Sequence, residues 1–140
     1  MHKKLCLYTD GGSRGNPGPA ALGIVVADER GRIIEEYSEY LGRKTNNEAE
    51  YHAVIKALEL AKRFSAREVI ITLDSQLVVN QLKGKYKIKK KHLEKLVHRV
   101  REKEKGFYKV CYVHVRRENP YIQKADRLVN QKLNRVLKEI

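Results

Sequence analysis

The chain has 140 residues, a length typical of one domain that buries about two thirds of the surface of its unfolded chain, so we expect a single domain over residues 1–140. Hydrophobic residues make up 41% of the sequence and charged residues 34%, which excludes disordered and fibrous classes. Lys and Arg outnumber Asp and Glu by 30 to 17, for a net charge of +13. We therefore expect a polyanionic partner, ahead of an acidic membrane surface.

Neither membrane insertion nor export is predicted. The longest apolar run, residues 20–27, is too short to cross a bilayer, and the segment Met1-His2-Lys3-Lys4-Leu5 is followed by Asp10 before a signal-peptide core develops. We expect a cytoplasmic protein without membrane association. Cys6 and Cys111 lack metal-ligand spacing and fall in apolar runs, which favours two reduced core cysteines.

Three strands are predicted in the first half of the chain. Residues 5–9, 21–27 and 33–41 are rich in apolar or β-favouring residues and are separated by turn signals, with a hairpin turn at residues 29–31. After Gly42 the apolar residues recur at intervals of three and four, which predicts an amphipathic helix over residues 46–64. Its start, TNNE at residues 45–48, fits a capping box.

The second half alternates strands and helices. Residues 69–73 are nearly all apolar, which predicts a central strand buried on both faces, followed by a short helix over residues 75–82 capped by Asp74 or Ser75. Periodicity then predicts a helix around residues 93–100, a strand over residues 107–115 and a last helix. The apolar stripe of that last helix consists of Val129, Leu133, Val136, Leu137 and Ile140. This order predicts an α/β fold, a mixed sheet with helices on both faces.

Two aspartates directly follow predicted strands. Asp10 closes the first strand and precedes the glycine-rich residues 11–18, where backbone amides can approach a phosphate or a sugar. Asp74 follows the central strand, and α/β sheets commonly place their sites at strand ends. A turn-forming role for Asp10 and a helix-capping role for Asp74 are the alternatives.

Two further acids fall on apolar stripes of predicted helices. Glu50 lies four residues before Val54, and Asp126 lies three residues before Val129. A carboxylate buried there is costly unless a cation or a proton neutralises it, whereas an acid that merely caps or frays from the helix start needs no partner. If both helices pack at the strand ends, four carboxylates converge. An all-oxygen ligand set suits Mg²⁺ or Mn²⁺ and excludes a soft-ligand zinc site.

Three segments, in this order, resemble motifs of the ribonuclease H type 1 family: residues 10–18 (DGGSRGNPG), 45–51 (TNNEAEY) and 72–76 (TLDSQ). A fourth segment, residues 125–130 (ADRLVN), is looser but lies where the family has its last acid. The resemblance covers nearly the whole chain. It implies an RNase H-like α/β fold, in which three antiparallel strands are followed by parallel additions to give a five-stranded mixed sheet flanked by helices on both faces.

The resemblance implies an endonuclease that hydrolyses the RNA strand of RNA–DNA hybrids by a two-metal-ion mechanism, leaving 3′-hydroxyl and 5′-phosphate ends. By similarity, two Mg²⁺ ions, or Mn²⁺ as a substitute, would be held by Asp10, Glu50, Asp74 and Asp126. Asp10 resembles the acid shared by both ions, with Glu50 and Asp74 on the leaving-group side and Asp126 on the water side. The alternatives are a broader activity that includes double-stranded RNA, and a catalytically silent hybrid-binding module. No obligate protein partner is evident, so we expect a monomer.

The family contacts 2′-hydroxyls and base edges in the minor groove through the loop after its first strand and the start of its first helix. By similarity these contacts would fall on Gly12, Ser13, Asn16, Asn46, Asn47 and Gln76. Thr45 resembles the family residue that holds a DNA-strand phosphate at the positive end of the helix dipole. For each of these small polar residues, turn or cap chemistry is the alternative.

The sequence departs from some bacterial members in its basic segment. Residues 83–105 hold eleven Lys and Arg against three Glu and have no Trp, whereas those members carry a longer basic handle with tryptophan. We hypothesise that residues 83–91 (KGKYKIKKK) replace the handle as a phosphate-tracking surface through Lys87, Lys89, Lys90 and Lys91. A solvated charged face that favours thermostability is the alternative.

The loop before the last helix also differs, because some relatives place a histidine in its mobile part. Here the nearby histidine, His114, falls within the last predicted strand, and we expect it to be packed there rather than to carry protons. Electrostatic substitutes for a loop histidine would be Arg116, Arg117, Glu118 or Asn119.

Overall fold

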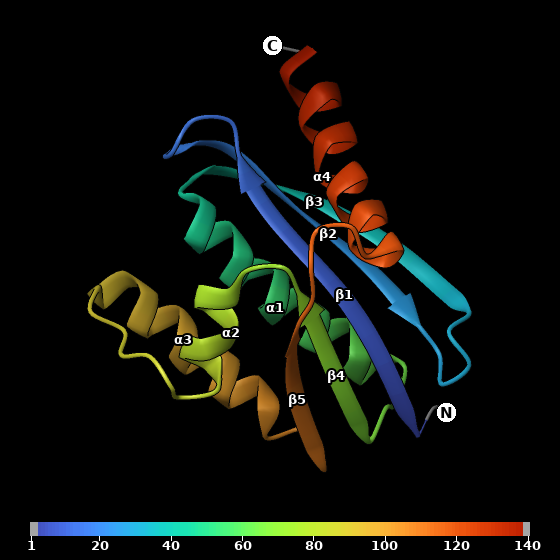
Figure 1. Ribbon diagram of the computed structural model, residues 1–140. Helices are drawn as coiled ribbons and strands as arrows, with labels where there is room; N and C mark the ends of the chain where they lie inside the picture. The colour runs from blue at the N-terminus through green and yellow to red at the C-terminus, as the bar shows by residue number, and fades with distance from the viewer. Residues whose placement is uncertain (1–2, 139–140) are drawn as a thin grey trace.

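The computed structural model describes residues 3–138, so Met1, His2, Glu139 and Ile140 lie outside the described residues. The elements, shown in Figure 1, are β1 (Lys4–Ser13), β2 (Gly18–Ala27), β3 (Ile33–Lys44), α1 (Asn46–Arg63), β4 (Glu68–Leu73), α2 (Gln76–Leu82), α3 (Lys91–Glu104), β5 (Lys109–His114) and α4 (Pro120–Lys138). Their order is the predicted one. Within residues 3–138, every helix is too short or too polar to span a bilayer.

The sheet has five strands in the order β3-β2-β1-β4-β5. The first three strands pair antiparallel, and β4 and β5 are added parallel to β1. Helix α1 packs over β1 on one face of the sheet and α3 packs on α1, whereas α4 covers β2, β1 and β3 on the opposite face (Figure 1). The predicted mixed sheet with helices on both faces is confirmed.

The core lies mainly between the sheet and α1. Its largest fully buried side chains include Tyr51 and Leu58 from α1 and Leu5, Leu7 and Ile24 from the sheet. Burying a side chain of this size stabilises the fold by roughly 1.5–3 kcal/mol. On the other face, α4 buries Ile122, Ala125, Val129 and Leu133, of which Val129 and Leu133 form a small cluster with Ala21 of β2.

Strand β1 is longer than predicted. Residues 10–13 continue the antiparallel ladder and pair with residues 20–23 of β2. The glycine-rich segment is therefore mostly the two arms of a hairpin, and only residues 14–17 connect them. Asp10 lies within the strand, opposite Gly23, and not at its end as predicted. The apolar pattern ends at Thr9, but backbone pairing does not require apolar side chains, so the ladder continues.

Strand β4 is buried on one face and only partly buried on the other, where Thr72 is buried but Ile70 is not, which corrects the prediction. Val69, Ile71 and Leu73 are buried, but Ile70 is half-buried on the face that α4 only partly covers. Cys6 and Cys111 flank Ile70 in the register. Both are free thiols and half-buried, so they lie at the border of the open sheet face and not in the core.

Two glycines determine how closely the helices approach the sheet. A Cβ atom on Gly11 would lie 2.3 Å from the backbone carbonyl of Ala49 in α1. A Cβ atom on Gly23 would lie 2.3 Å from the carbonyl oxygen of Ala125 in α4. Because backbone atoms cannot rotate away as a side chain can, both helices approach the sheet this closely only with glycine at these positions.

We predict that Gly23→Ala lowers the free energy of unfolding by about 2–3 kcal/mol, since α4 must move away from β2 to admit the methyl group. Gly12→Ala is the matched control, because its Cβ faces the same helix but meets Val129 Cγ1 at 3.8 Å, an ordinary contact. Urea denaturation of both variants measures the difference. Equal unfolding free energies would show that Gly23 does not set the distance between α4 and the sheet.

Candidate active site

The site forms where β1 and β4 separate. The last pair in their parallel register is Tyr8 with Thr72. Asp10 and Asp74 each follow two residues later, and because side chains alternate along an extended chain, both return to the same face of the sheet. Ser75 caps α2, its Oγ accepting a hydrogen bond from Val78 N at 3.2 Å. The Asp74 carboxylate is therefore not used as the helix cap.

Helix α1 brings a third acid to this point. The predicted capping box is present: Thr45 Oγ1 accepts from Glu48 N at 3.1 Å, and Glu48 Oε1 accepts from Thr45 N at 2.9 Å. The cap uses Glu48 and directs Glu50 toward the sheet, where only 6% of its surface is exposed. Glu50 Oε1 accepts a hydrogen bond from Gly11 N at 2.5 Å, which fixes the orientation of the buried carboxylate.

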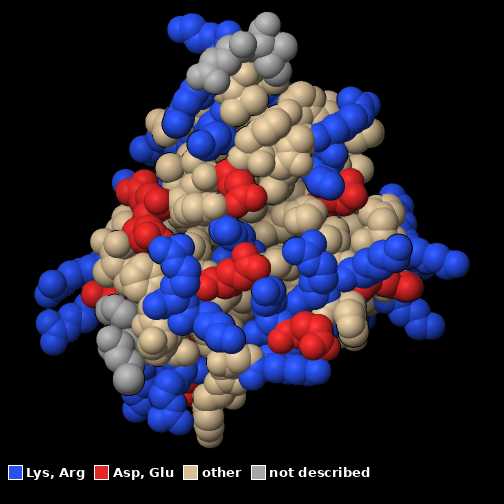
Figure 2. Space-filling view, turned by 180° about the vertical axis from the view of Figure 1, so that it is seen from behind, with Lys and Arg blue, Asp and Glu red and all other residues tan. Residues whose placement is uncertain are grey.

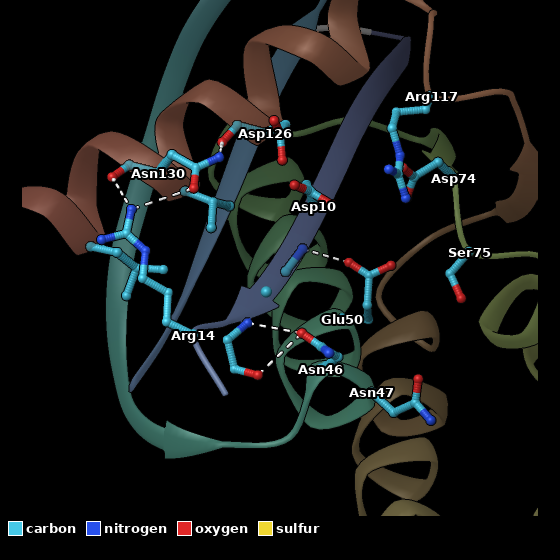
Figure 3. Close-up of a pocket in the computed structure, with 15 residues that line it drawn as sticks. Asp10, Arg14, Asn46, Asn47, Glu50, Asp74, Ser75, Arg117, Asp126 and Asn130 are labelled. Carbon is cyan, nitrogen blue, oxygen red and sulfur yellow. Dashed lines mark hydrogen bonds and ion pairs between the residues drawn. The ribbon is translucent and has the colours of Figure 1, made fainter. Parts of the chain in front are cut away.

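The carboxylates of Asp10, Glu50 and Asp74 converge, with one oxygen from each within 4.8 Å of the others. Figure 3 shows Asp126 approaching Asp10 from α4. Glu50 is buried, as its place on the apolar stripe predicted. Asp126 is exposed at the rim, contrary to that prediction, because its helix crosses the edge of the site and leaves this turn open to solvent.

The crowding changes the acidity of two of these groups. Burial raises the pKa of Asp10 to about 8, with further increases from the charges of Asp74 and Asp126 and a partial offset from Arg117. Burial, followed by the charges of Asp10 and Asp74, also raises the pKa of Glu50 well above its ordinary value, although the hydrogen bond from Gly11 N opposes the shift. The cluster therefore retains protons near neutral pH unless a cation replaces them. A hard divalent cation suits this all-oxygen donor set.

The acids lie in an open cleft of about 490 Å³. Eight of the residues that we predicted for the site line it: Asp10, Gly12, Ser13, Asn46, Asn47, Glu50, Asp74 and Asp126. The remaining lining residues are Gly11, Arg14, Ser75, Arg117, Val129, Asn130 and Leu133. Strands, helices α1 and α4, and the loop before α4 thus all contribute to one surface.

Hydrogen bonds connect the end of β1 with the start of α1. Asn46 Oδ1 accepts from Ser13 N at 2.9 Å and from Ser13 Oγ at 3.1 Å, and Asn46 N donates to Asn16 Oδ1 at 3.0 Å. Asn16 therefore holds Asn46, which lines the cleft, but does not line the cleft itself. Thr45 and Gln76 also lie outside the lining, the first as the cap of α1 and the second exposed at the start of α2.

The basic segment forms a neighbouring groove of about 610 Å³. It is lined by Asn47, Leu77, Gln81, Lys85, Tyr86, Lys87, Lys89, Lys90 and Leu93. Asn47 lines both the acidic cleft and this groove, so the two hollows adjoin. Lys91 begins α3 and is exposed, but does not line the groove.

Positive charge is not confined to this segment. Figure 2 shows Lys and Arg side chains spread over the back of the molecule, with Asp and Glu among them. Cations outside the segment form ion pairs, as in Lys56 with Glu39 at 3.6 Å and Lys103 with Glu59 at 3.1 Å. Residues 83–91, by contrast, contain no acid. The segment therefore differs from the rest of the surface because no acidic residue within it neutralises its lysines, and not because it holds more cations.

The loop between β5 and α4 supplies a cation and not an imidazole. Arg117 Nε lies 3.8 Å from Asp74 Oδ2, while 88% of the Arg117 side chain is exposed. His114 is the last residue of β5 and is exposed, so the prediction that it is packed is wrong. It lies at the end of an edge strand, and it does not line the cleft.

Sequence reasoning did not identify Arg14 and Asn130 as site residues. Asn130 follows Asp126 by four residues, and this spacing places both on one side of α4, so a helical projection would have found it. Arg14 lies in a connection whose path, and therefore whose partners, no periodicity predicts. Its long side chain reaches α4, more than a hundred residues away in the sequence (Figure 3).

Known proteins match this chain over most of its length. A family described as reverse transcriptase-like matches residues 8–132. Ribonuclease HI of Halobacterium salinarum is 42% identical over 127 residues, which are 91% of this chain and 63% of that protein. The bifunctional protein Rv2228c of Mycobacterium tuberculosis is 39% identical over 133 residues, 94% of this chain and 36% of that protein. The chain thus spans between about a third and two thirds of the length of these curated relatives.

Solved structures of ribonucleases H are similar to this chain in fold and in sequence. The crystal structure of RNase H1 from Halobacterium salinarum has a TM-score of 0.90 and 41% identity, covering 94% of this chain and 98% of that chain. LC11-RNase H1, isolated from compost by a metagenomic approach, was solved in complex with an RNA/DNA hybrid. That complex has a TM-score of 0.90 and 39% identity, covering 95% of this chain and 99% of that chain. On its sequence motifs, its strand order and these matches, the chain belongs to the ribonuclease H type 1 family.

Proposed function

We propose that this chain is a metal-dependent ribonuclease H that hydrolyses the RNA strand of RNA–DNA hybrids. The observation that carries the proposal is the convergence of three carboxylates within 4.8 Å, with a fourth at the rim, in a chain whose net charge is +13. Such a chain attracts a polyanion and at the same time concentrates negative charge at one point. The related LC11-RNase H1 was crystallised with an RNA/DNA hybrid, which supports the same substrate here.

Asp10, Glu50, Asp74 and Asp126 fit a pair of Mg²⁺ ions, with Mn²⁺ as a substitute, because hard oxygen donors from four elements meet in one open cleft. When bound, such a pair activates a water and stabilises the departing 3′ oxygen, giving 3′-hydroxyl and 5′-phosphate ends. Asp10 lies between Asp74 and Asp126 and is placed to serve both positions (Figure 3). Glu50, fixed by Gly11 N, presents its carboxylate without rearrangement.

The residues around the acids suit a duplex with an exposed minor groove. Ser13, Asn46 and Asn47 offer neutral donors and acceptors beside the acids, and Gly12 leaves room for close approach. These are the groups that recognise 2′-hydroxyls and base edges. The N-terminus of α1 adds partial positive charge at the same place. The unpaired lysines of residues 83–91 continue the surface beyond Asn47 and would follow the phosphates of one strand.

All four acids come from one chain, so we propose that a monomer is sufficient for activity. Double-stranded RNA also displays 2′-hydroxyls in a wide minor groove, and it is therefore the substrate against which strictness must be measured. A silent binding module would retain affinity for the hybrid without cleaving it.

We predict that the chain with Mg²⁺ or Mn²⁺ cleaves the labelled RNA strand of a hybrid, and that Asp10→Asn and Glu50→Gln each lower the rate by about 1000-fold. A factor of 1000 corresponds to about 4 kcal/mol of lost transition-state stabilisation, since about 1.4 kcal/mol changes a rate tenfold. Glu48→Gln is the matched control two residues from Glu50, because glutamine also serves a capping box. Parallel assays on duplex RNA and with EDTA complete the set.

Cleavage in EDTA, or cleavage by Asp10→Asn at the rate of the unaltered chain, would refute the metal-dependent nuclease. Binding of the hybrid without cleavage under any metal would identify the silent module. Equal rates on hybrid and duplex RNA would broaden the substrate class and contradict hybrid specificity.

Because the pKa of Asp10 is raised, we predict that Asp10→Asn stabilises the metal-free fold although it lowers the cleavage rate. The folded protein holds a proton that the unfolded chain has released, so stability falls as pH rises from about 4 to about 8. In metal-free buffer near pH 8, Asp10→Asn should raise the Tm, by about 4 °C for each kcal/mol relieved. The gain should vanish toward pH 4, where Asp10 is protonated.

Thermal melts at both pH values, with and without Mg²⁺, measure this effect. Mg²⁺ should raise the Tm of the unaltered chain near pH 8 and leave that of Asp10→Asn nearly unchanged. A destabilised Asp10→Asn at pH 8 would mean that the carboxylates do not repel one another in the folded protein.

We predict that replacing Lys87, Lys89, Lys90 and Lys91 with Gln weakens hybrid binding and flattens its salt dependence, with about 0.9 lost from the log–log slope per phosphate contact removed. The measurement uses the Asp10→Asn background to prevent cleavage. Lys62, Arg63, Arg67 and Lys109, exposed at the opposite end of the sheet, supply a control with the same loss of charge. An equal slope for the two sets would assign the basic segment to general solvation.

A further inference from the structure

We propose that Arg14 is a positioning residue that ties the connection between β1 and β2 to helix α4 and thereby fixes Asp126. The inference rests on the proposed function, because the position of Asp126 matters only if Asp126 is one of the four acids that hold the metal ions. It concerns a residue that lines the cleft but stands outside the four acids.

Arg14 is anchored on α4 through two asparagines. Its Nη2 donates to Asn134 Oδ1 at 2.6 Å, and the same nitrogen lies 3.4 Å from the carbonyl oxygen of Asn130 and 3.5 Å from Asn130 Oδ1. Asn130 Nδ2 in turn donates to the carbonyl oxygen of Asp126 at 3.1 Å. Figure 3 shows the part of this chain that runs from Arg14 through Asn130 to Asp126, along one side of the cleft.

Asp126 depends on its helix more than the other acids do. Asp10 belongs to a paired strand, and Glu50 is buried and held by Gly11 N. Asp126 is exposed, so its position follows from that of its helix, whose buried residues are Ile122, Ala125, Val129 and Leu133. Its distance from Asp10 is therefore set by whatever holds α4 in place.

The first turn of α4 has its own anchor. The ring of Tyr121 stacks on Tyr8 at 4.5 Å between centroids, and its hydroxyl donates to the carbonyl oxygen of Gly31 at 2.6 Å. Asn119 Oδ1 caps the helix by accepting from Tyr121 N at 3.0 Å. Asp126 lies between this anchor and the contact of Arg14 with Asn134. Loss of Arg14 would remove the polar contact on one side of Asp126 and leave the buried Val129 and Leu133 in place.

The other end of Arg14 is also held. Its backbone N donates to the carbonyl oxygen of Pro19 at 2.8 Å, which closes the connection between the two strands. The preceding residue, Ser13, is bonded to Asn46 through both its N and its Oγ. Arg14 therefore joins α4 to the polar groups that we propose for the minor groove, so that the substrate side and Asp126 move as one unit.

The test compares Arg14→Ala, Asn134→Ala and the double variant, with Arg135→Ala as a control that removes an equal charge from the same helix. In metal-free protein, hydrogen exchange at residues 126–134 should accelerate in all three variants and not in the control. The kcat for hybrid cleavage should fall about 10-fold in each single variant and no further in the double, because both remove the 2.6 Å contact of Arg14 with Asn134. The Mg²⁺ concentration for half-maximal rate should rise, and KM for the hybrid should not change.

A direct phosphate contact by Arg14 would give a different result. Arg14→Ala would then raise KM and flatten the salt dependence, Asn134→Ala would behave like the unaltered chain, and the proposal would be overturned. Unchanged exchange at residues 126–134 in both single variants would also overturn it. An unaltered chain that cleaves no substrate would refute the proposed function instead, and hydrogen exchange would still decide the role of Arg14.

Discussion

The repulsion among carboxylates at the point where β1 and β4 separate is the constraint on which the structure depends. Folding brings Asp10 and Asp74 from two strands, Glu50 from α1 and Asp126 from α4 to one cleft. Burial and mutual charge raise the pKa of Asp10 to about 8, so ionisation of this acid destabilises the metal-free fold. The offsets are local: Gly11 N on Glu50, and Arg117 beside Asp74. Divalent ions would complete the compensation.

The surrounding architecture acts mainly to maintain this proximity. Parallel addition of β4 to β1 aligns two strand ends, and the glycines at positions 11 and 23 let helices on opposite faces approach the same strand pair. The capping box sets where α1 begins and thus which acid faces the sheet. Helix α4 is held by its buried residues Ile122, Ala125, Val129 and Leu133, by its first turn and by Arg14, and Asp126 is the most exposed of the four acids because this turn crosses the open edge of the site.

The sequence predicted the element order and the meeting of Asp10, Glu50 and Asp74, because periodicity and strand ends are local signals. The predictions were wrong for features that depend on how helices cover the sheet and on how far the strands pair. Asp10 lies inside β1 because antiparallel pairing continues through glycines, and Ile70 is half-buried because α4 does not extend over β4. His114 is exposed because β5 is an edge strand. The reach of Arg14 to α4 could not be predicted, since a long side chain in a connection carries no pattern.

The most direct test of this account is anomalous diffraction from crystals soaked in Mn²⁺ under conditions that support cleavage. The account predicts two anomalous peaks in the cleft, both contacting Asp10, one of them shared with Glu50 and Asp74 and the other with Asp126. Mn²⁺ bound elsewhere, with the carboxylate cluster empty at a concentration that sustains turnover, would contradict it.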